Sequence, residues 1–125
     1  MIHGIGTDIV SISRFQKAME KNTKSFLEMI FTDHEIASTI KKKNRAIHLA
    51  GKFAAKESVL KAFGKGLGEG ISLKEIEIDN SRTGKPEVHL HGKGLELAKK
   101  MEIKNIHITI SHEKQFAVAF ILFEN

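Results

Sequence analysis

Two carboxylates stand where the local pattern expects small or apolar side chains. Asp8 follows Gly4 and Gly6 along one face of a predicted strand, and Glu57 shares a face of a predicted long helix with Phe53. Mg²⁺ prefers oxygen ligands in proteins and usually takes substrate phosphates for its remaining positions. Two carboxylates from separate elements therefore indicate a magnesium site that a diphosphate substrate would complete.

Each candidate residue also has a simpler structural explanation. Asp8 can cap the following helix, and Glu57 can form an ordinary ion pair with Lys61 one helical turn later. His112 ends an otherwise apolar stripe of a predicted strand, where a hairpin or core histidine is equally reasonable. Other histidines have no comparable context: His3, His48, His89, His91 and His107. The structural explanation is favoured for each residue alone, whereas the three together point to a site.

Lysines along the same helix and in the loop after it could supply cations for phosphate groups. They are Lys52, Lys56, Lys61 and Lys65. Most of them would be solvated in the absence of a ligand. The glycine-rich segment 64–68 permits a close backbone approach, but it matches neither the P-loop pattern nor the dinucleotide fingerprint. A helix C-cap explains this segment equally well.

Composition limits the classes of function. The chain has 125 residues, of which 41% are hydrophobic, and this suits a single domain over residues 1–125. It contains no cysteine, which excludes disulfides and thiolate chemistry. Neither a signal peptide nor a membrane span is predicted, so we expect a cytoplasmic protein. A formal net charge of +5 indicates an anionic partner, while the absence of Tyr and Trp disfavours single-stranded nucleic acid.

The elements that must position these residues follow an α+β order. A strand that ends near Asp8 is predicted first, and three short helices and one long helix follow. Thr32 and Glu35 form a capping-box pattern for the third helix. Asn44 is expected to cap the long helix, which stops at Gly64. The remaining predicted elements are a hairpin within 76–90, a helix over 93–101, and strands over 104–112 and 115–123.

Three short blocks are specific in combination. Residues 4–10 read Gly-Ile-Gly-Thr-Asp-Ile-Val, residues 53–64 run from Phe-Ala-Ala-Lys-Glu-Ser to Lys-Ala-Phe-Gly, and residues 110–112 read Ile-Ser-His. In order, spacing and total length the chain resembles the holo-acyl-carrier-protein synthases, which are 4′-phosphopantetheinyl transferases. The resemblance implies an α+β fold with a long central helix packed on a small antiparallel sheet. It also implies a homotrimer with active sites at the subunit interfaces.

The resemblance assigns roles to the candidate residues. Asp8 and Glu57 match the magnesium ligands of the family, and Lys61 matches a lysine in its phosphate-binding region. His112 matches a histidine that reaches the nucleotide of coenzyme A from the adjacent subunit. The resemblance therefore places Mg²⁺ and coenzyme A together in a cleft between subunits.

The remaining part of the coenzyme A site shows small departures from the family. Lys52 and Gly64 match positions at this site, and Lys52 stands where arginine is frequent. A point-charge contact with phosphate would then replace a bidentate one. Ser58 stands where alanine is usual, and Glu113 stands where a small hydroxyl residue often follows the histidine. Neither departure changes a metal ligand.

The implied reaction is attack by a serine hydroxyl of an acidic acyl carrier protein on the pantetheine-side phosphate of coenzyme A. Adenosine 3′,5′-bisphosphate leaves, and the product serves fatty acid biosynthesis. Glu57, or a metal-bound water next to it, is expected to accept the serine proton, and Lys61 is the second residue assigned to catalysis. Arg14 matches a carrier-binding position. Nearby residues offer further cations and apolar anchors: Phe15, Lys17, Met19, Lys21, Lys24 and Phe26. A solvated helix face also explains the three lysines.

Two other classes of protein remain as alternatives. The helices beginning at Thr32 and Asn44 flank a basic stretch, residues 41–45, much as in a helix-turn-helix module that binds nucleic acid. The second of these helices is too apolar to read base edges well, which favours a central packing role. A purely structural trimer would leave Glu57 unexplained.

Overall fold

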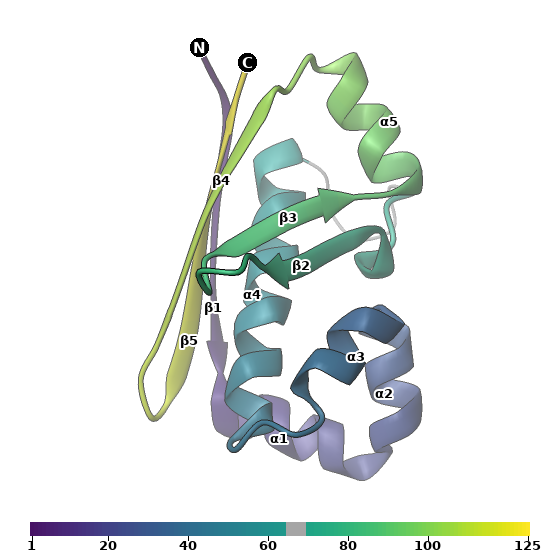
Figure 1. Ribbon diagram of the computed structural model, residues 1–125, viewed down its shortest axis with the longest axis vertical. Helices are drawn as coiled ribbons and strands as arrows, with labels where there is room; N and C mark the ends of the chain where they lie inside the picture. Colours follow the sequence, from purple (N-terminus) through teal and green to yellow (C-terminus); the bar gives the residue numbers. More distant parts are fainter. Residues whose placement is uncertain (65–69) are drawn as a thin grey trace.

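A long central helix packs against a three-stranded antiparallel sheet (Figure 1). The remaining elements pack around other sides of this helix. The computed structural model describes residues 1–64 and 70–125. The expected α+β architecture of a single domain is confirmed. The elements are β1 (Ile2–Ser11), α1 (Ile12–Lys21), α2 (Thr23–Ile30), α3 (Asp33–Thr39), α4 (Arg45–Phe63), a 3₁₀ turn (Leu73–Glu75), β2 (Ile76–Asn80), β3 (Pro86–Leu90), α5 (Gly92–Lys100), β4 (Asn105–His112) and β5 (Phe116–Glu124).

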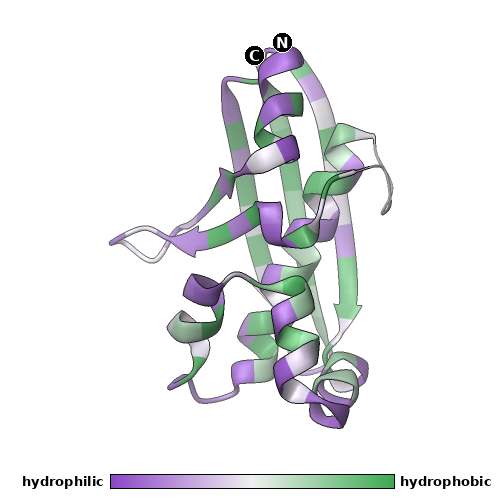
Figure 2. Ribbon diagram, turned by 90° about the vertical axis from the view of Figure 1, so that its right-hand side faces the viewer, coloured by the Kyte–Doolittle hydropathy of each residue, from purple (hydrophilic) through white to green (hydrophobic). Residues whose placement is uncertain are grey.

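The three-stranded sheet has the order β1-β5-β4, so the last strand of the chain lies in its middle. β1 pairs with β5 through Ser11, and β1 therefore continues three residues beyond Asp8, where we expected it to end. Both termini lie at one end of the sheet, where the Asn125 N–H donates to the Met1 carbonyl at 3.1 Å (Figure 2). The separate β2–β3 hairpin projects to one side of this body (Figure 2).

α4 is enclosed because the sheet covers one side and the hairpin, α1 and α3 cover others. From Leu49 to Phe63, the only residues that are not buried are Phe53, Glu57 and Lys61. These three residues are spaced by one turn and form a single open line along the helix. We expected Glu57 to lie on a face of the helix that packs against apolar side chains. This expectation was wrong, because Glu57 lies on the open line and not against the core. No helix within residues 1–64 and 70–125 has the length and apolar character needed to cross a membrane.

Most helix boundaries follow from the predicted caps. The Thr32 hydroxyl accepts from the Glu35 N–H and the Glu35 carboxylate accepts from the Thr32 N–H, which confirms the capping box. Gly64 ends α4 in the left-handed conformation at φ +75°. Asn44 does precede α4, but its side chain makes no capping hydrogen bond. Its own backbone is left-handed at φ +58°, so it turns the chain into the helix and does not cap it as predicted.

Two glycines of β1 allow the strand to touch the backbone of α4. A Cβ atom on Gly6 would lie 2.9 Å from both the Ser58 carbonyl carbon and the Ala62 nitrogen, and closer still to the Ser58 oxygen. A Cβ on Gly4 would meet the Ala62 carbonyl in the same way. The missing side chains thus make room for another backbone, which brings Asp8, two residues after Gly6, beside α4.

Candidate functional site

The two predicted metal ligands open into one cavity of about 480 Å³ between β1, α1 and α4. The Asp8 side chain is 19% exposed, and the Lys61 ammonium donates to its Oδ1 atom at 3.1 Å. Lys61 also donates to the Thr7 carbonyl at 2.9 Å. Within the part of the chain that the structure describes, Lys61 therefore binds Asp8 across the two elements and not Glu57 on its own helix.

The carboxylate of Glu57 is partly buried and lies close to a second carboxylate. Burial raises the pKa of Glu57, the charge of Asp8 raises it further, and Lys61 offsets part of the effect. Two carboxylates that repel one another are a suitable donor set for a divalent cation. The described residues contain no group of three or more metal-ligating side chains, so Asp8 and Glu57 would leave most coordination positions to water or substrate oxygens. This open arrangement fits Mg²⁺ bound together with a phosphorylated substrate.

The same cavity carries the predicted carrier-binding residue. Arg14 lines it together with apolar side chains that include Phe26 and Phe53. A cation and an apolar wall therefore lie next to the two carboxylates. Phe15 also lines this cavity, but it is only 5% exposed because it packs against three other phenylalanine rings, so it offers less apolar surface than was expected of it.

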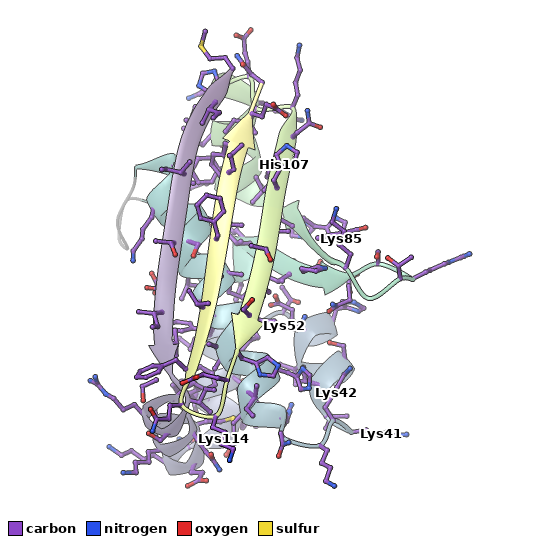
Figure 3. All side chains as sticks on the ribbon, turned by 90° about the vertical axis from the view of Figure 1, so that its left-hand side faces the viewer. Lys41, Lys42, Lys52, Lys85, His107 and Lys114 are labelled. Atoms are coloured by element: carbon purple, nitrogen blue, oxygen red, sulfur yellow. The ribbon has the colours of Figure 1, made fainter. Side chains whose placement is uncertain are left out.

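A second cavity of about 580 Å³ lies on the other flank of α4. Lys52 and His112 both line it, as do Lys42 and His48. Figure 3 shows Lys42 and Lys52 beside the edge of the sheet formed by β4. The Lys52 ammonium is largely buried and donates to the Ile78 carbonyl at 2.6 Å, so one of its protons is already engaged by the protein.

The predicted site residues consequently form two groups in one chain. Asp8 and His112 belong to the two edge strands, and the central strand β5 separates them through Ala119 and Ala117. α4 runs over the sheet between the two cavities, with Glu57 facing one and Lys52 facing the other. Gly64 ends the same helix as an exposed residue, while Lys65 falls outside the described residues.

Lys56 does not belong to either cavity. Its ammonium is fully buried and contacts the Glu35 carboxylate at 2.7 Å, the Leu73 carbonyl at 2.9 Å and the Ile76 carbonyl at 2.6 Å. Burial lowers the pKa of Lys56, although Glu35 opposes this shift. The prediction that Lys56 is available to phosphate was wrong, because a buried ion pair holds its three protons.

Lysines 52 and 56 together cover the free edge of the hairpin. Residues four apart on a helix rise by about 6 Å, close to the spacing of about 6.6 Å between alternate residues of a strand. Lys56 and Lys52 can therefore bind the alternate carbonyls of Ile76 and Ile78. The Glu35 Oε2 atom accepts from the Ile78 N–H at 2.7 Å, so side chains replace a neighbouring strand along β2.

Two residues that join distant elements escaped the sequence analysis. Glu35 was recognised only as a capping residue, yet its carboxylate also carries the buried contacts to Lys56 and β2. His48 was set aside, but its ring lies 6.5 Å from that of His112. The spacing of four residues between His48 and Lys52 was the available signal, since it places both on one helical face.

Comparisons with known proteins agree with the resemblance seen in the sequence. Residues 4–121 match the model of the 4′-phosphopantetheinyl transferase superfamily. The holo-[acyl-carrier-protein] synthase of Syntrophus aciditrophicus is 44% identical over 124 residues, covering 99% of this chain and 97% of that protein. The crystal structure of the Neisseria meningitidis synthase matches with a TM-score of 0.91 at 33% identity, covering all of both chains. The Helicobacter pylori synthase in complex with coenzyme A matches with a TM-score of 0.85 at 32% identity, covering 96% of this chain and 99% of that one.

Proposed function

The chain belongs to the holo-[acyl-carrier-protein] synthases of the 4′-phosphopantetheinyl transferase superfamily, and we propose that Asp8 and Glu57 hold the Mg²⁺ ion for its reaction. The enzyme transfers the phosphopantetheine arm of coenzyme A to acyl carrier protein and thereby serves fatty acid biosynthesis. The acceptor is a serine hydroxyl, and adenosine 3′,5′-bisphosphate is released.

The observation that carries the metal proposal is the convergence of Asp8 and Glu57 in one cavity. Burial, and after it the charge of Asp8, raises the pKa of Glu57, and a bound cation would oppose both effects. When bound, Mg²⁺ supplies Lewis-acid neutralisation of the charge on the diphosphate. Lys61 lies one turn beyond Glu57 with its ammonium exposed, and it can place a further positive charge against a phosphate oxygen.

The protein side chains around the metal ligands fit the acceptor half of the reaction. Arg14 attracts an acidic carrier to the cavity that contains both carboxylates, which brings the acceptor hydroxyl close to Glu57. A carboxylate oxygen of Glu57 accepts the hydroxyl proton, directly or through one water molecule.

We further propose that the chain works as a homotrimer whose active sites combine residues of two subunits. One chain presents the carboxylates and the pair of Lys52 and His112 on opposite flanks of α4, so a second copy can bring the two halves together. The sheet face turned away from α4 supports assembly (Figure 3). It carries five apolar side chains with exposed fractions from 37% to 64%: Ile5, Ile9, Phe116, Val118 and Phe120. Association would remove this apolar surface from water.

The deciding experiment measures the mass gain of one phosphopantetheine on an apo carrier protein. Transfer by the wild-type chain should require both coenzyme A and Mg²⁺. Asp8→Asn and Glu57→Gln should each lower kcat/KM by more than about 100-fold, which is the scale expected when one charge-stabilising group is lost. Glu96→Gln removes an exposed carboxylate of α5 that lies outside both cavities and serves as the matched control. Undiminished transfer in the presence of a chelator would refute the magnesium assignment.

A further inference from the structure

The cavity that contains Lys52 and His112 holds a second imidazole that the family motifs do not include. His48 comes from α4 and His112 from the end of β4, and their ring centroids are 6.5 Å apart in an edge-to-face arrangement. Both histidines are exposed to the solvent of the cavity. A ligand in the cavity can therefore reach both rings.

The close packing of α4 on β4 creates this juxtaposition. A Cβ atom on Gly51 would lie 3.1 Å from the Ile110 side chain, so the absence of a side chain at Gly51 permits a close contact between the two elements. Ile110 lies two residues before His112 on the same strand face. His48 lies three residues before Gly51, on the turn of α4 nearest the end of that strand.

The charges around His48 make the cavity receptive to an anion. Lys42 lies in the turn before α4, Lys52 lies one helical turn after His48, and His112 faces it from β4. Across the cavity, His34 of α3 is bonded to Asp79 of β2 at 3.0 Å, which leaves that carboxylate already paired. Burial, followed by Lys42, His112 and Lys52, lowers the pKa of His48. The lowered pKa favours the neutral form of the His48 imidazole, and this ring can take up a proton when a dianion binds beside it.

We propose that His48 is a further substrate-binding residue, which acts with His112 to select the 3′-phosphate of coenzyme A. This inference rests on the proposed function, because the diphosphate of coenzyme A is assigned there to Asp8, Glu57 and Lys61. The 3′-phosphate is then the only other phosphate on the nucleotide half of the molecule. Its dianion favours the protonated imidazole of His48, so affinity for the 3′-phosphate rises as the pH falls from about 8.5 toward 6.5.

The test compares adenosine 3′,5′-bisphosphate with adenosine 5′-monophosphate by isothermal titration at pH 6.5, 7.5 and 8.5. The wild-type chain should prefer the bisphosphate, more strongly at the lower pH. His48→Phe keeps a ring of similar shape, and His48→Gln keeps hydrogen bonding without titration in this range. Both variants should lose about tenfold of the preference, the scale of one charge-assisted hydrogen bond, together with part of its pH dependence. Their affinity for the monophosphate should not change.

His89→Phe provides the matched control, since His89 lies on β3 beside Glu87 and lines a different cavity. This variant should retain both the preference and its pH dependence. An unchanged preference in His48→Phe and His48→Gln, with normal binding by the wild-type chain, would overturn the inference and leave the proposed function intact. A wild-type chain that binds neither coenzyme A nor the bisphosphate would overturn the proposed function and the inference with it.

Discussion

Gly6→Ala tests whether the contact between β1 and α4 sets the geometry of the carboxylate pair. The new Cβ would lie 2.9 Å from the Ser58 carbonyl carbon and closer to its oxygen, whereas an ordinary C···O contact is about 3.3 Å or longer. The helix backbone cannot yield as a side chain would, so β1 must retreat by about 1 Å. Asp8 follows two residues later and moves with the strand, away from Glu57.

The expected effects differ in size for stability and for catalysis. Overpacking costs about 1–3 kcal/mol, and the reduced freedom of the unfolded chain offsets up to about 1 kcal/mol of this. A net loss of about 1–2 kcal/mol should lower Tm by about 4–8 °C. A displacement of about 1 Å at a reacting centre can lower the rate by about 100-fold, so kcat/KM should fall much more than stability alone explains.

The assay is magnesium-dependent transfer to apo carrier protein, measured well below the Tm of each variant. Gly94→Ala is the control, because its Cβ would lie 3.8 Å from the nearest atom and should stabilise α5. Gly4→Ala meets the Ala62 carbonyl but lies farther from Asp8 along the strand, so it should lose stability with a smaller loss of activity. Equal activities of Gly6→Ala and Gly94→Ala would refute the reasoning.

Three further predictions concern charge and assembly. The fold raises the pKa of Glu57, so ionised Glu57 destabilises the metal-free protein at neutral pH. This destabilisation disappears when the pH falls below the ordinary glutamate pKa, because the carboxyl is then protonated in both the folded and the unfolded chain. Glu57→Gln should therefore raise the metal-free Tm at pH 7 but not at about pH 3, and thermal melts that show the same gain at both values would contradict this. Glu35→Gln should lower the free energy of unfolding in urea by about 3–5 kcal/mol, because it leaves Lys56 buried without its counter-charge. The double variant Glu35→Leu with Lys56→Met should lower it less. A larger loss of stability in the double variant would disprove this explanation. Ile9→Lys puts a charge on the apolar sheet face and should yield monomers in light scattering, so an unchanged assembly would exclude that face as the interface.

The sequence predicted the features that local spacing determines. The alternation in β1 places Gly4, Gly6 and Asp8 on one face, and the structure confirms that this face meets α4. The capping box at Thr32 and the glycine stop at Gly64 also depend on a few neighbouring residues, and both were correct. Such features can be predicted because the backbone period fixes which side chains share a face.

Contacts between distant segments could not be predicted in this way. His48 and His112 meet only because α4 packs on β4. Glu35 reaches Lys56 through the packing of α3 against α4 and β2. The positions of several lysines along a helix do not indicate which of them will be buried by distant segments. Lys56 was therefore grouped with Lys61, although one is fully buried and the other is largely exposed.

Three consecutive residues of α4 explain how one helix connects these separate contacts. Successive side chains on a helix point about 100° apart, so Lys56, Glu57 and Ser58 face three different neighbours. Lys56 holds β2, Glu57 opens toward Asp8, and the Ser58 hydroxyl donates to the Ala54 carbonyl at 2.7 Å within the buried packing against the sheet. Rotation of α4 that moved Glu57 would also break the buried ion pair of Lys56 and the packing at Ser58. The residues beside Glu57 therefore fix its direction, although neither of them lines the carboxylate cavity.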